Sequence, residues 1–253
     1  MKSKIFAAAA LTLAALGTAN AADLPAPIYK AAPPAPVFTW TGCYVGGGGG
    51  YGWWKQDSYV QVGGVPITSS NTNGGSGWFG QGQMGCDYQF SAPFFNIPLV
   101  IGVFGDYEGG NINGTNSFPG VVGLERESAT WSVGGRVGTL ISPRVLTYFD
   151  GGWTQARFDS VSYNLAIPGG AFSGATLAGQ TYNGWFIGSG FEYAFDWLPI
   201  SGLFLKTEYR YAQYGGVNVP ITGLPLAGVT LNSQKATQLI STELVWRFNW
   251  FGR

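Results

Sequence analysis

Residues 78–90 read WFGQGQMGCDYQF, and their side chains alternate between two characters. Trp78, Met84, Tyr88 and Phe90 share one parity, whereas the other parity holds three glutamines and Asp87. A period of two is typical of a β-strand with one apolar face and one polar face. The stretch therefore predicts a strand that lies between an apolar and a polar environment.

The same alternation recurs along the chain and predicts eight strands in all. The other seven segments are residues 40–54, 99–108, 129–141, 144–157, 181–195, 203–214 and 238–250. In residues 238–250, for example, Leu244 and Trp246 share one face, while Glu243 and Arg247 share the other.

The connections between these segments alternate in length. Long polar connections are expected at residues 55–76, 109–127, 159–180 and 215–235, and short ones at 91–98, 142–143 and 196–202. Outer-membrane barrels have long external loops, short periplasmic turns and an even number of antiparallel strands. We therefore predict an all-β fold, a closed eight-stranded antiparallel transmembrane β-barrel. A soluble β-sandwich or a lipocalin-like barrel is the alternative.

Charged residues of both signs lie on the polar parity of the segments. Since an eight-stranded barrel is just wide enough for side chains to fill it, we expect a side-chain-filled lumen with an ion network rather than an active site. Paired carboxylates such as those of Glu208 and Glu243 could otherwise do acid–base work. The network is predicted to comprise Asp106, Glu108, Arg136, Asp150, Glu192, Lys206, Glu208, Arg210, Glu243 and Arg247.

Composition supports a membrane-facing surface. Only 10% of the residues are charged, against about 25% in a typical soluble domain, and 16% are aromatic. Aromatic side chains that gather near the segment ends predict two interfacial girdles. They are Trp40, Tyr44, Trp53, Trp54, Trp78, Tyr88, Phe90, Trp153, Trp185, Trp197, Trp246 and Trp250.

The first residues predict a cleaved signal peptide, residues 1–21. Lys2 and Lys4 precede an apolar run at residues 5–16, and Ala19-Asn20-Ala21 supplies small residues for cleavage. A membrane anchor, the alternative, would need about 20 apolar residues. Residues 22–38 are rich in Pro and Ala and predict a periplasmic tether, followed by the outer-membrane β-barrel domain at residues 39–253.

No nucleic acid, cofactor, metal or catalytic activity is expected. Removing Lys2 and Lys4 from a precursor with 13 basic and 13 acidic residues leaves a formal charge of −2, and nucleic-acid binders carry a basic patch. The chain has no histidine, the commonest metal ligand and a frequent general base. The G-x-G-x-x-G pattern at residues 80–85 lies within a predicted strand rather than before a helix, as a dinucleotide site would require.

Cys43 and Cys86 occupy adjacent predicted strands. If the first hairpin turns near residues 64–65, the two cysteines lie almost opposite each other. The periplasm is oxidising, so the sequence allows either a disulfide or two separate buried thiols.

Several motifs together resemble a known family. They are ADLP at residues 22–25, FTWTGCYVG at 38–46, GWFIGSGFEY at 184–193 and KTEYRY at 206–211. The chain resembles the small outer-membrane β-barrel proteins of alphaproteobacteria, of the porin-family or outer-membrane immunogenic type, which are related to the OmpA-like barrel. Departures from the family pattern are the two cysteines, which replace frequent aromatics, and residues 251–253, which extend past the usual terminal aromatic.

The resemblance implies location in the outer membrane of a Gram-negative bacterium. It implies contact with outer-membrane lipid and lipopolysaccharide, and handling by periplasmic chaperones and the barrel assembly machinery. The C-terminal assembly signal would lie among Trp246, Phe248, Trp250 and Phe251.

We expect a structural, surface-exposed protein that contributes to envelope integrity and surface interactions, alone or as a homo-oligomer. A small-solute porin with a narrow channel is the alternative. An outer-membrane hydrolase or acyltransferase is disfavoured because histidine is absent.

Overall fold

The computed structural model describes residues 39–91, 97–118, 120–195, 197, 200–224 and 227–248. The predicted signal peptide and tether, and Trp250 and Phe251, lie outside these residues. No helix in the described part is long and apolar enough to cross a membrane.

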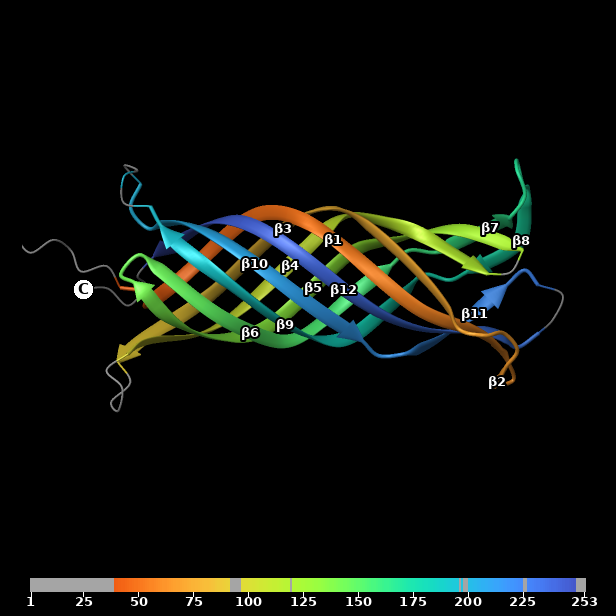
Figure 1. Cartoon of the computed structure of the whole chain (residues 1–253), viewed down its shortest axis with the longest axis horizontal. Helices are drawn as coiled ribbons and strands as arrows, with labels where there is room; N and C mark the ends of the chain where they lie inside the picture. The colour runs from red at the N-terminus through yellow and green to blue at the C-terminus, as the bar shows by residue number, and fades with distance from the viewer. Residues whose placement is uncertain are drawn as a thin grey trace, which may run out of the picture. The chain divides into compact units, whose positions relative to one another are not determined.

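Eight long strands account for most of the described residues. They are β1 (Gly42–Val62), β3 (Asn71–Ser91), β4 (Pro98–Phe118), β5 (Val121–Ser142), β6 (Val145–Phe158), β9 (Gln180–Ala194), β10 (Leu203–Tyr214) and β12 (Val229–Phe248). Each pairs antiparallel with the next in this order, and β12 also pairs with β1, from Cys43↔Phe248 to Val62↔Val229. The pairings thus form a ring, whose strands run obliquely along the long axis in Figure 1.

Each predicted strand segment corresponds to one of these long strands, but the predicted long loops are largely wrong. β1, β3, β4, β5 and β12 continue deep into them. The physical reason is that the apolar–polar alternation ends where the outward face no longer meets an apolar environment, although the backbone pairing continues.

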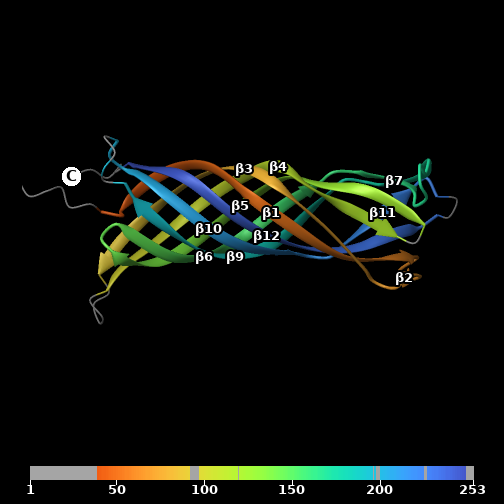
Figure 2. The same cartoon turned by 45° about the horizontal axis from the view of Figure 1, so that its top comes forward.

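Four short strands lie where these extensions end. They are β2 (Val65–Pro66), β7 (Val161–Leu165), β8 (Phe172–Leu177) and β11 (Val217–Thr222). Figures 1 and 2 place them at the same end of the strands, which we call the distal end. The strands β3, β5 and β9 end at the other, proximal end.

The short strands join the distal extensions together. β7 pairs with both β5 and β8, β8 pairs with β11, and β11 pairs with β12. Backbone hydrogen bonds from Gly63 N to Gly228 O and from Ala166 N to Gly120 O link the remaining turns. The distal end is therefore one connected structure with its own apolar core, formed by Val60, Val161, Tyr163, Ala175, Leu177, Val219, Val229 and Leu231.

A ring of outward-facing aromatics, the distal girdle, crosses the strands between their middle and the distal end. Ring pairs such as Tyr51–Trp78 (centroids 5.1 Å apart) and Trp131–Trp153 (4.6 Å) belong to it. The girdle comprises Tyr51, Trp53, Trp78, Tyr107, Trp131, Trp153, Trp185, Tyr209 and Tyr211.

The hydroxyl groups of three tyrosines in this girdle point in one direction. Tyr51 Oη donates to Ser76 Oγ (2.8 Å), Tyr209 Oη to Gln238 Oε1 (2.7 Å) and Tyr211 Oη to Gln213 Oε1 (3.1 Å). Each acceptor is displaced along its strand towards the distal end. Beyond the girdle lies a polar belt with the exposed ion pairs Lys55–Asp57 and Arg126–Asp159.

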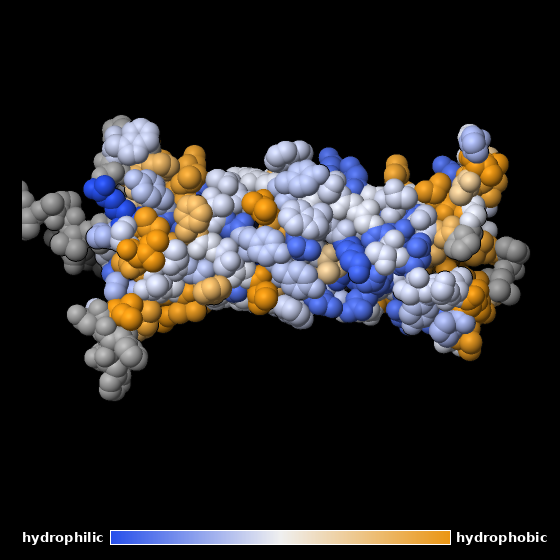
Figure 3. All heavy atoms as spheres, in the orientation of Figure 1, coloured by the Kyte–Doolittle hydropathy of each residue, from blue (hydrophilic) through white to orange (hydrophobic). Residues whose placement is uncertain are grey.

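On the proximal side of the girdle the outward faces are apolar. Val103, Val133, Phe149, Ile187 and Leu244 are all exposed there. A second group of aromatics, the proximal girdle, ends this apolar band with the ring pairs Tyr88–Phe90, Tyr193–Phe195 and Trp246–Phe248. Figure 3 shows the hydrophobic ends and the hydrophilic belt between the middle and the distal end.

Three aromatics predicted for the girdles lie inside instead. Trp40, Tyr44 and Trp54 are almost completely buried. Tyr44 and Trp54 have even numbers, and in β1 the even parity faces inwards. Glycines on both faces of this strand conceal that parity in the sequence.

Candidate functional site: the charged interior

The interior is lined by polar side chains because the second parity of every long strand faces inwards. All ten residues of the predicted ion network lie on this parity and are buried. The structure arranges the interior charges in three clusters along the axis, here called proximal, central and distal.

The proximal cluster is a closed set of four ions. Arg136 contacts Asp87 and Glu192, each at 2.5 Å, and Arg247 contacts the same two carboxylates at 2.5 and 2.6 Å. The Tyr44 ring lies between the guanidiniums, 4.6 Å from that of Arg136 and 4.8 Å from that of Arg247. Two positive and two negative groups therefore balance in a water-poor space.

Asp87 was not in the predicted network, although its parity is polar in the sequence. Its neighbours on that parity are glutamines rather than ions, so nothing marked it as part of a charge network. The alternation places the Asp87 side chain on the polar parity, so this pattern alone could have added Asp87 to the predicted ion network.

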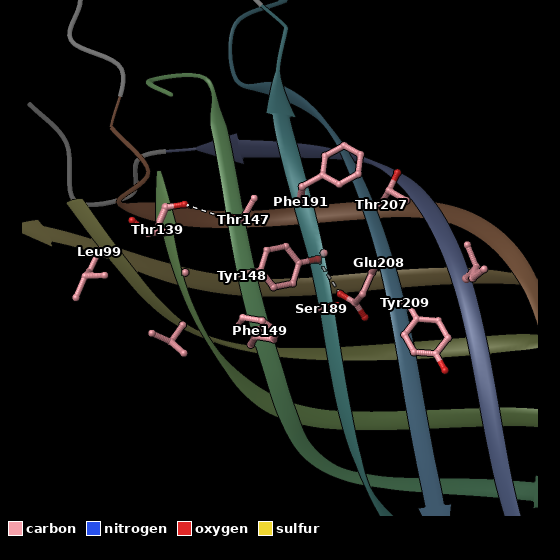
Figure 4. Close-up of a pocket in the computed structure, with 14 residues that line it drawn as sticks. Leu99, Thr139, Thr147, Tyr148, Phe149, Ser189, Phe191, Thr207, Glu208 and Tyr209 are labelled. Atoms are coloured by element: carbon pink, nitrogen blue, oxygen red, sulfur yellow. Dashed lines mark hydrogen bonds between the residues drawn. The ribbon is translucent and has the colours of Figure 1, made fainter. Parts of the chain in front are cut away.

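The central cluster is centred on Arg210 and Lys206 of β10. Arg210 contacts Asp106 (2.9 Å), Glu108 (3.4 Å) and Glu208 (2.8 Å). Lys206 contacts Glu208 (2.8 Å) and Glu243 (3.3 Å). Tyr148 donates its hydroxyl to Glu208 Oε2 at 2.9 Å, the contact drawn in Figure 4.

Asp150 lies buried beside the central cluster but forms no salt bridge with a cation of the described residues. Lys206 and Arg210 thus share the centre of the interior with five carboxyl groups. The structure brings nine of the ten predicted residues into ion pairs and leaves Asp150 at the edge of the network.

The distal cluster lies beyond the distal girdle, level with the polar belt. Lys235 Nζ contacts Glu125 at 2.7 Å and donates to Gln56, and its ammonium lies 3.9 Å from the centroid of the Phe158 ring. Asn116 Nδ2 donates to Glu125 Oε2 at 2.9 Å. Glu125 and Lys235 fall in segments that were predicted to be loops, so the sequence did not predict this cluster.

Burial has the largest effect on the pKa values of Glu127 and Lys235 in the distal cluster. It raises the pKa of Glu127 to about 7, although Thr130, which donates to Glu127 Oε1 at 2.8 Å, and the nearby Lys235 favour the ionised form. Burial also lowers the pKa of Lys235, and Glu125 opposes that shift. Both directions reflect the cost of placing a charge away from water.

Apolar groups flank the three clusters at both ends. At the proximal end, the rings of Trp40 and Phe204 lie 5.0 Å apart, and the Arg247 guanidinium lies over both. At the distal end, the apolar core of the short strands covers the Lys235 cluster. Within the described residues, no group of three or more Cys, Asp or Glu side chains has the arrangement of a metal site.

The outward faces of β5, β6, β9 and β10 form an apolar depression of about 730 Å³. Figure 4 shows Phe149, Phe191, Thr207 and Tyr209 among its lining residues. Ser189 is small and lies between larger neighbours, which hollows the surface there. This depression lies in the apolar band, so it belongs to the surface that faces lipid if the band spans a membrane.

Cys43 and Cys86 are direct partners in the β1–β3 pairing and form a disulfide. Both belong to the outward-facing parity of their strands. The bridge therefore lies on the outer surface rather than in the charged interior.

Comparison with known proteins gives a consistent picture. No family model matches the chain. The 31 kDa outer-membrane immunogenic proteins of Brucella melitensis and Brucella suis are each 29% identical to it over 234 residues, which is 87% of this chain and 90% of the relative. The expected resemblance to outer-membrane immunogenic proteins and the outer-membrane location are confirmed.

Solved structures of outer-membrane proteins are also similar. OprG from Pseudomonas aeruginosa is 12% identical, with a TM-score of 0.48 over 82% of this chain and 97% of that one. Ail, the attachment invasion locus protein of Yersinia pestis, is 14% identical, with a TM-score of 0.31 over 79% of this chain and 99% of that one.

Proposed function

We propose that this homologue of the 31 kDa outer-membrane immunogenic proteins is a structural, surface-exposed protein. Its eight long strands form a closed β-barrel that crosses the outer membrane at the apolar band, and its lumen is filled. Its role is to support the envelope and to present the distal end at the cell surface, without conducting solutes or catalysing a reaction.

The observation that carries this proposal is that ion pairs span the interior. In the ring of pairings, β4 and β10 are separated by three strands on either side, and so are β5 and β12. Arg210 of β10 contacts Asp106 of β4, and Lys235 of β12 contacts Glu125 of β5. Side chains therefore meet across the full width of the interior at two levels.

Such contacts are unfavourable for a channel. A solute would have to separate these paired charges in order to pass. Each charge would then be buried without its partner, and breaking a buried pair costs roughly 3–5 kcal/mol. The apolar groups at both ends add to the obstruction. An interior of this kind stabilises the wall rather than providing a path.

The surface supports the membrane placement. Two aromatic girdles enclose an apolar band, as the interfaces of an outer-membrane barrel require. The tyrosine hydroxyl groups of the distal girdle donate towards the polar belt, which is the direction of water in this placement. The proximal end would then face the periplasm, and the polar belt would meet lipopolysaccharide.

We propose that Trp246 and Phe248 of β12 belong to the assembly signal. The two rings lie together, with centroids 5.6 Å apart, and Trp246 is half-exposed on the outer surface. This position at the proximal end of the last strand is accessible to the barrel assembly machinery and to periplasmic chaperones. Trp250 and Phe251, the other predicted members, lie outside the described residues.

Conductance of the purified full chain in a planar lipid bilayer tests the function. We expect no stable open-channel steps, because the paired charges remain in place. A general porin added to the same bilayer serves as the positive control. Reproducible steps whose size follows the salt concentration would instead support the narrow-channel porin and contradict a filled lumen.

A further inference from the structure

The pairing of β1 with β3 is poor in the side-chain contacts that hold two strands in register. Residues directly opposite each other on neighbouring strands normally touch, and these cross-strand pairs stabilise a sheet. Of the ten successive pairs that begin with Gly46↔Gln83, eight contain at least one glycine. Three of them, such as Gly49↔Gly80, consist of two glycines. Most of this stretch therefore has no direct contact between opposite side chains.

The glycine run of β1 also removes the difference between its two faces. Residues 46–50 are all glycine, so no side chain there distinguishes an inward face from an outward one. A strand that slips by one residue turns every side chain to the opposite face, and glycine-rich strands specify their register weakly. Within the ten pairs, two side chains meet at Tyr51↔Trp78 and at Trp53↔Ser76. The first hairpin thus needs another feature that fixes its alignment.

The disulfide between Cys43 and Cys86 is such a feature. The two cysteines are direct partners at the proximal end of the same pairing, three residues before the glycine run begins. Cysteines whose Cα atoms are more than about 7 Å apart cannot be bridged. A slip of two residues carries the partners beyond that distance, and a slip of one residue turns one of them to the opposite face. The bond is therefore compatible with a single alignment of the two strands.

We propose that this disulfide sets the register of the first hairpin before the barrel closes, and that the two thiols are the substrate of a periplasmic thiol oxidoreductase. In the complete ring, β1 is paired with both β3 and β12, and β3 with both β1 and β4. Thiol–disulfide exchange requires access to each sulfur that is attacked. Strands that are paired on both edges restrict this access, whereas an unfolded hairpin allows it. Oxidation therefore belongs before closure, when the alignment of β1 is still undetermined.

The oxidation balances with a protein disulfide as the oxidant. The thiolate of one cysteine attacks that disulfide, whose bond breaks as a mixed disulfide forms. The thiolate of the other cysteine then attacks the mixed disulfide and releases the oxidant as a dithiol. Cys43 and Cys86 together lose two electrons and two protons, and the oxidant gains both. This chemistry suits the oxidising periplasm through which an outer-membrane protein passes.

Moving the bond along the pairing tests its role in register. Val45 and Met84 are the next outward-facing direct partners. The full chain with Cys43→Ser, Cys86→Ser, Val45→Cys and Met84→Cys, oxidised in urea, should refold into lipid vesicles as fast as the oxidised wild type. The chain with Cys43→Ser and Cys86→Ser alone should refold several-fold more slowly. Heat-dependent gel mobility measures the folded fraction.

A bond that is out of register provides the matched control. The chain with Cys43→Ser and Val45→Cys retains Cys86, so its two cysteines are two positions out of alignment. Oxidised in urea, it should yield several-fold less folded protein than the same chain kept reduced. Folding of this oxidised chain as fast as that of the chain with the relocated bond would overturn the proposal.

The order of events is measured in cells by trapping free thiols with an alkylating reagent after a pulse of labelled amino acid. We expect the bond in chains that still migrate as unfolded, and a several-fold delay of both bond and folding in cells that lack the oxidoreductase. Reduction of the folded wild type in detergent should leave its gel mobility unchanged, because the ring of pairings then holds the register. Folded chains with free thiols that are oxidised later, or unchanged oxidation without the oxidoreductase, would overturn the proposal.

Discussion

The four ions of the proximal cluster depend on one another more than most charged residues do. Arg136 and Arg247 each contact both Asp87 and Glu192, so every carboxylate serves two guanidiniums. Removing one member leaves an excess charge in a buried space. The stability of this cluster is therefore a property of the set rather than of a single pair.

Asp87→Ala should lower the free energy of unfolding by about 3–5 kcal/mol, the cost of breaking a buried pair. The measurement is urea unfolding in lipid or detergent, followed by the gel mobility of the folded form. Asp57→Ala is the control, because its exposed pair with Lys55 is worth at most about 1 kcal/mol. Similar losses in the two variants would contradict a coupled interior cluster.

The buried carboxyl group of Glu127 gives a second residue-level prediction. Its pKa is raised from 4.5 to about 7, so the folded chain holds this proton to a higher pH than the unfolded chain does. Its contribution to stability should therefore fall as the pH rises from about 4.5 to about 7, by up to roughly 3 kcal/mol.

Glu127→Gln should remove this part of the pH dependence, because the amide does not titrate. Unfolding midpoints measured across that pH range for both proteins give the difference. If the two curves run parallel from acid to neutral pH, Glu127 is not the group responsible.

At the scale of elements, β1 and β12 approach each other closely where β1 is rich in glycine. A Cβ added at Gly48 would lie 2.1 Å from the carbonyl oxygen of Thr242 in β12. A Cβ added at Gly47, the next residue, would have its nearest neighbour at 3.7 Å. The close approach of β1 and β12 therefore requires glycine at Gly48 but not at Gly47.

Gly48→Ala should therefore cost about 1–3 kcal/mol, the usual penalty for overpacking, while Gly47→Ala should change stability little. Thermal unfolding of the two variants, compared with wild type, separates these effects. Equal destabilisation would indicate a general requirement for flexible backbone in β1 instead of a close approach at Gly48.

The strands also show which parts of the fold could be predicted from the sequence. Alternation identified the eight long strands and the inward direction of residues such as Arg210 and Glu243, because each strand there separates an apolar surface from a polar interior. It failed beyond the distal girdle, where polar and small side chains occur on both faces and the two parities no longer differ clearly in character. Glu125 and Lys235, whose ion pair crosses the interior, were consequently assigned to loops.

At the scale of the whole molecule, the surface beyond the girdle is more ordered than a set of long loops. Every described cation on the outward face there, namely Lys55, Arg126 and Arg157, lies within a strand that is paired on both sides. Trypsin needs a flexible segment around its target. Residues 58–86, 109–124, 160–191 and 211–234, which include the distal turns, contain no Lys or Arg.

Trypsin added to intact cells should therefore leave the chain whole. Subtilisin, which has broad specificity, should cut in the turn at residues 166–171 between β7 and β8. Gel electrophoresis of the digests, with heat-unfolded protein as the trypsin-sensitive control, gives the result. Tryptic fragments that end at Lys55, Arg126 or Arg157 in the folded protein would contradict the paired distal extensions.

The pairing of β1 with β12 also has a consequence for the order of events during biogenesis. Cys43 is aligned with Phe248, so the ring of pairings joins the beginning of the folded part to its end. Contacts between residues so distant in sequence slow folding, because the whole intervening chain must be ordered before they form. The first strand must wait, with one edge unpaired, until the last strand has been synthesised and exported.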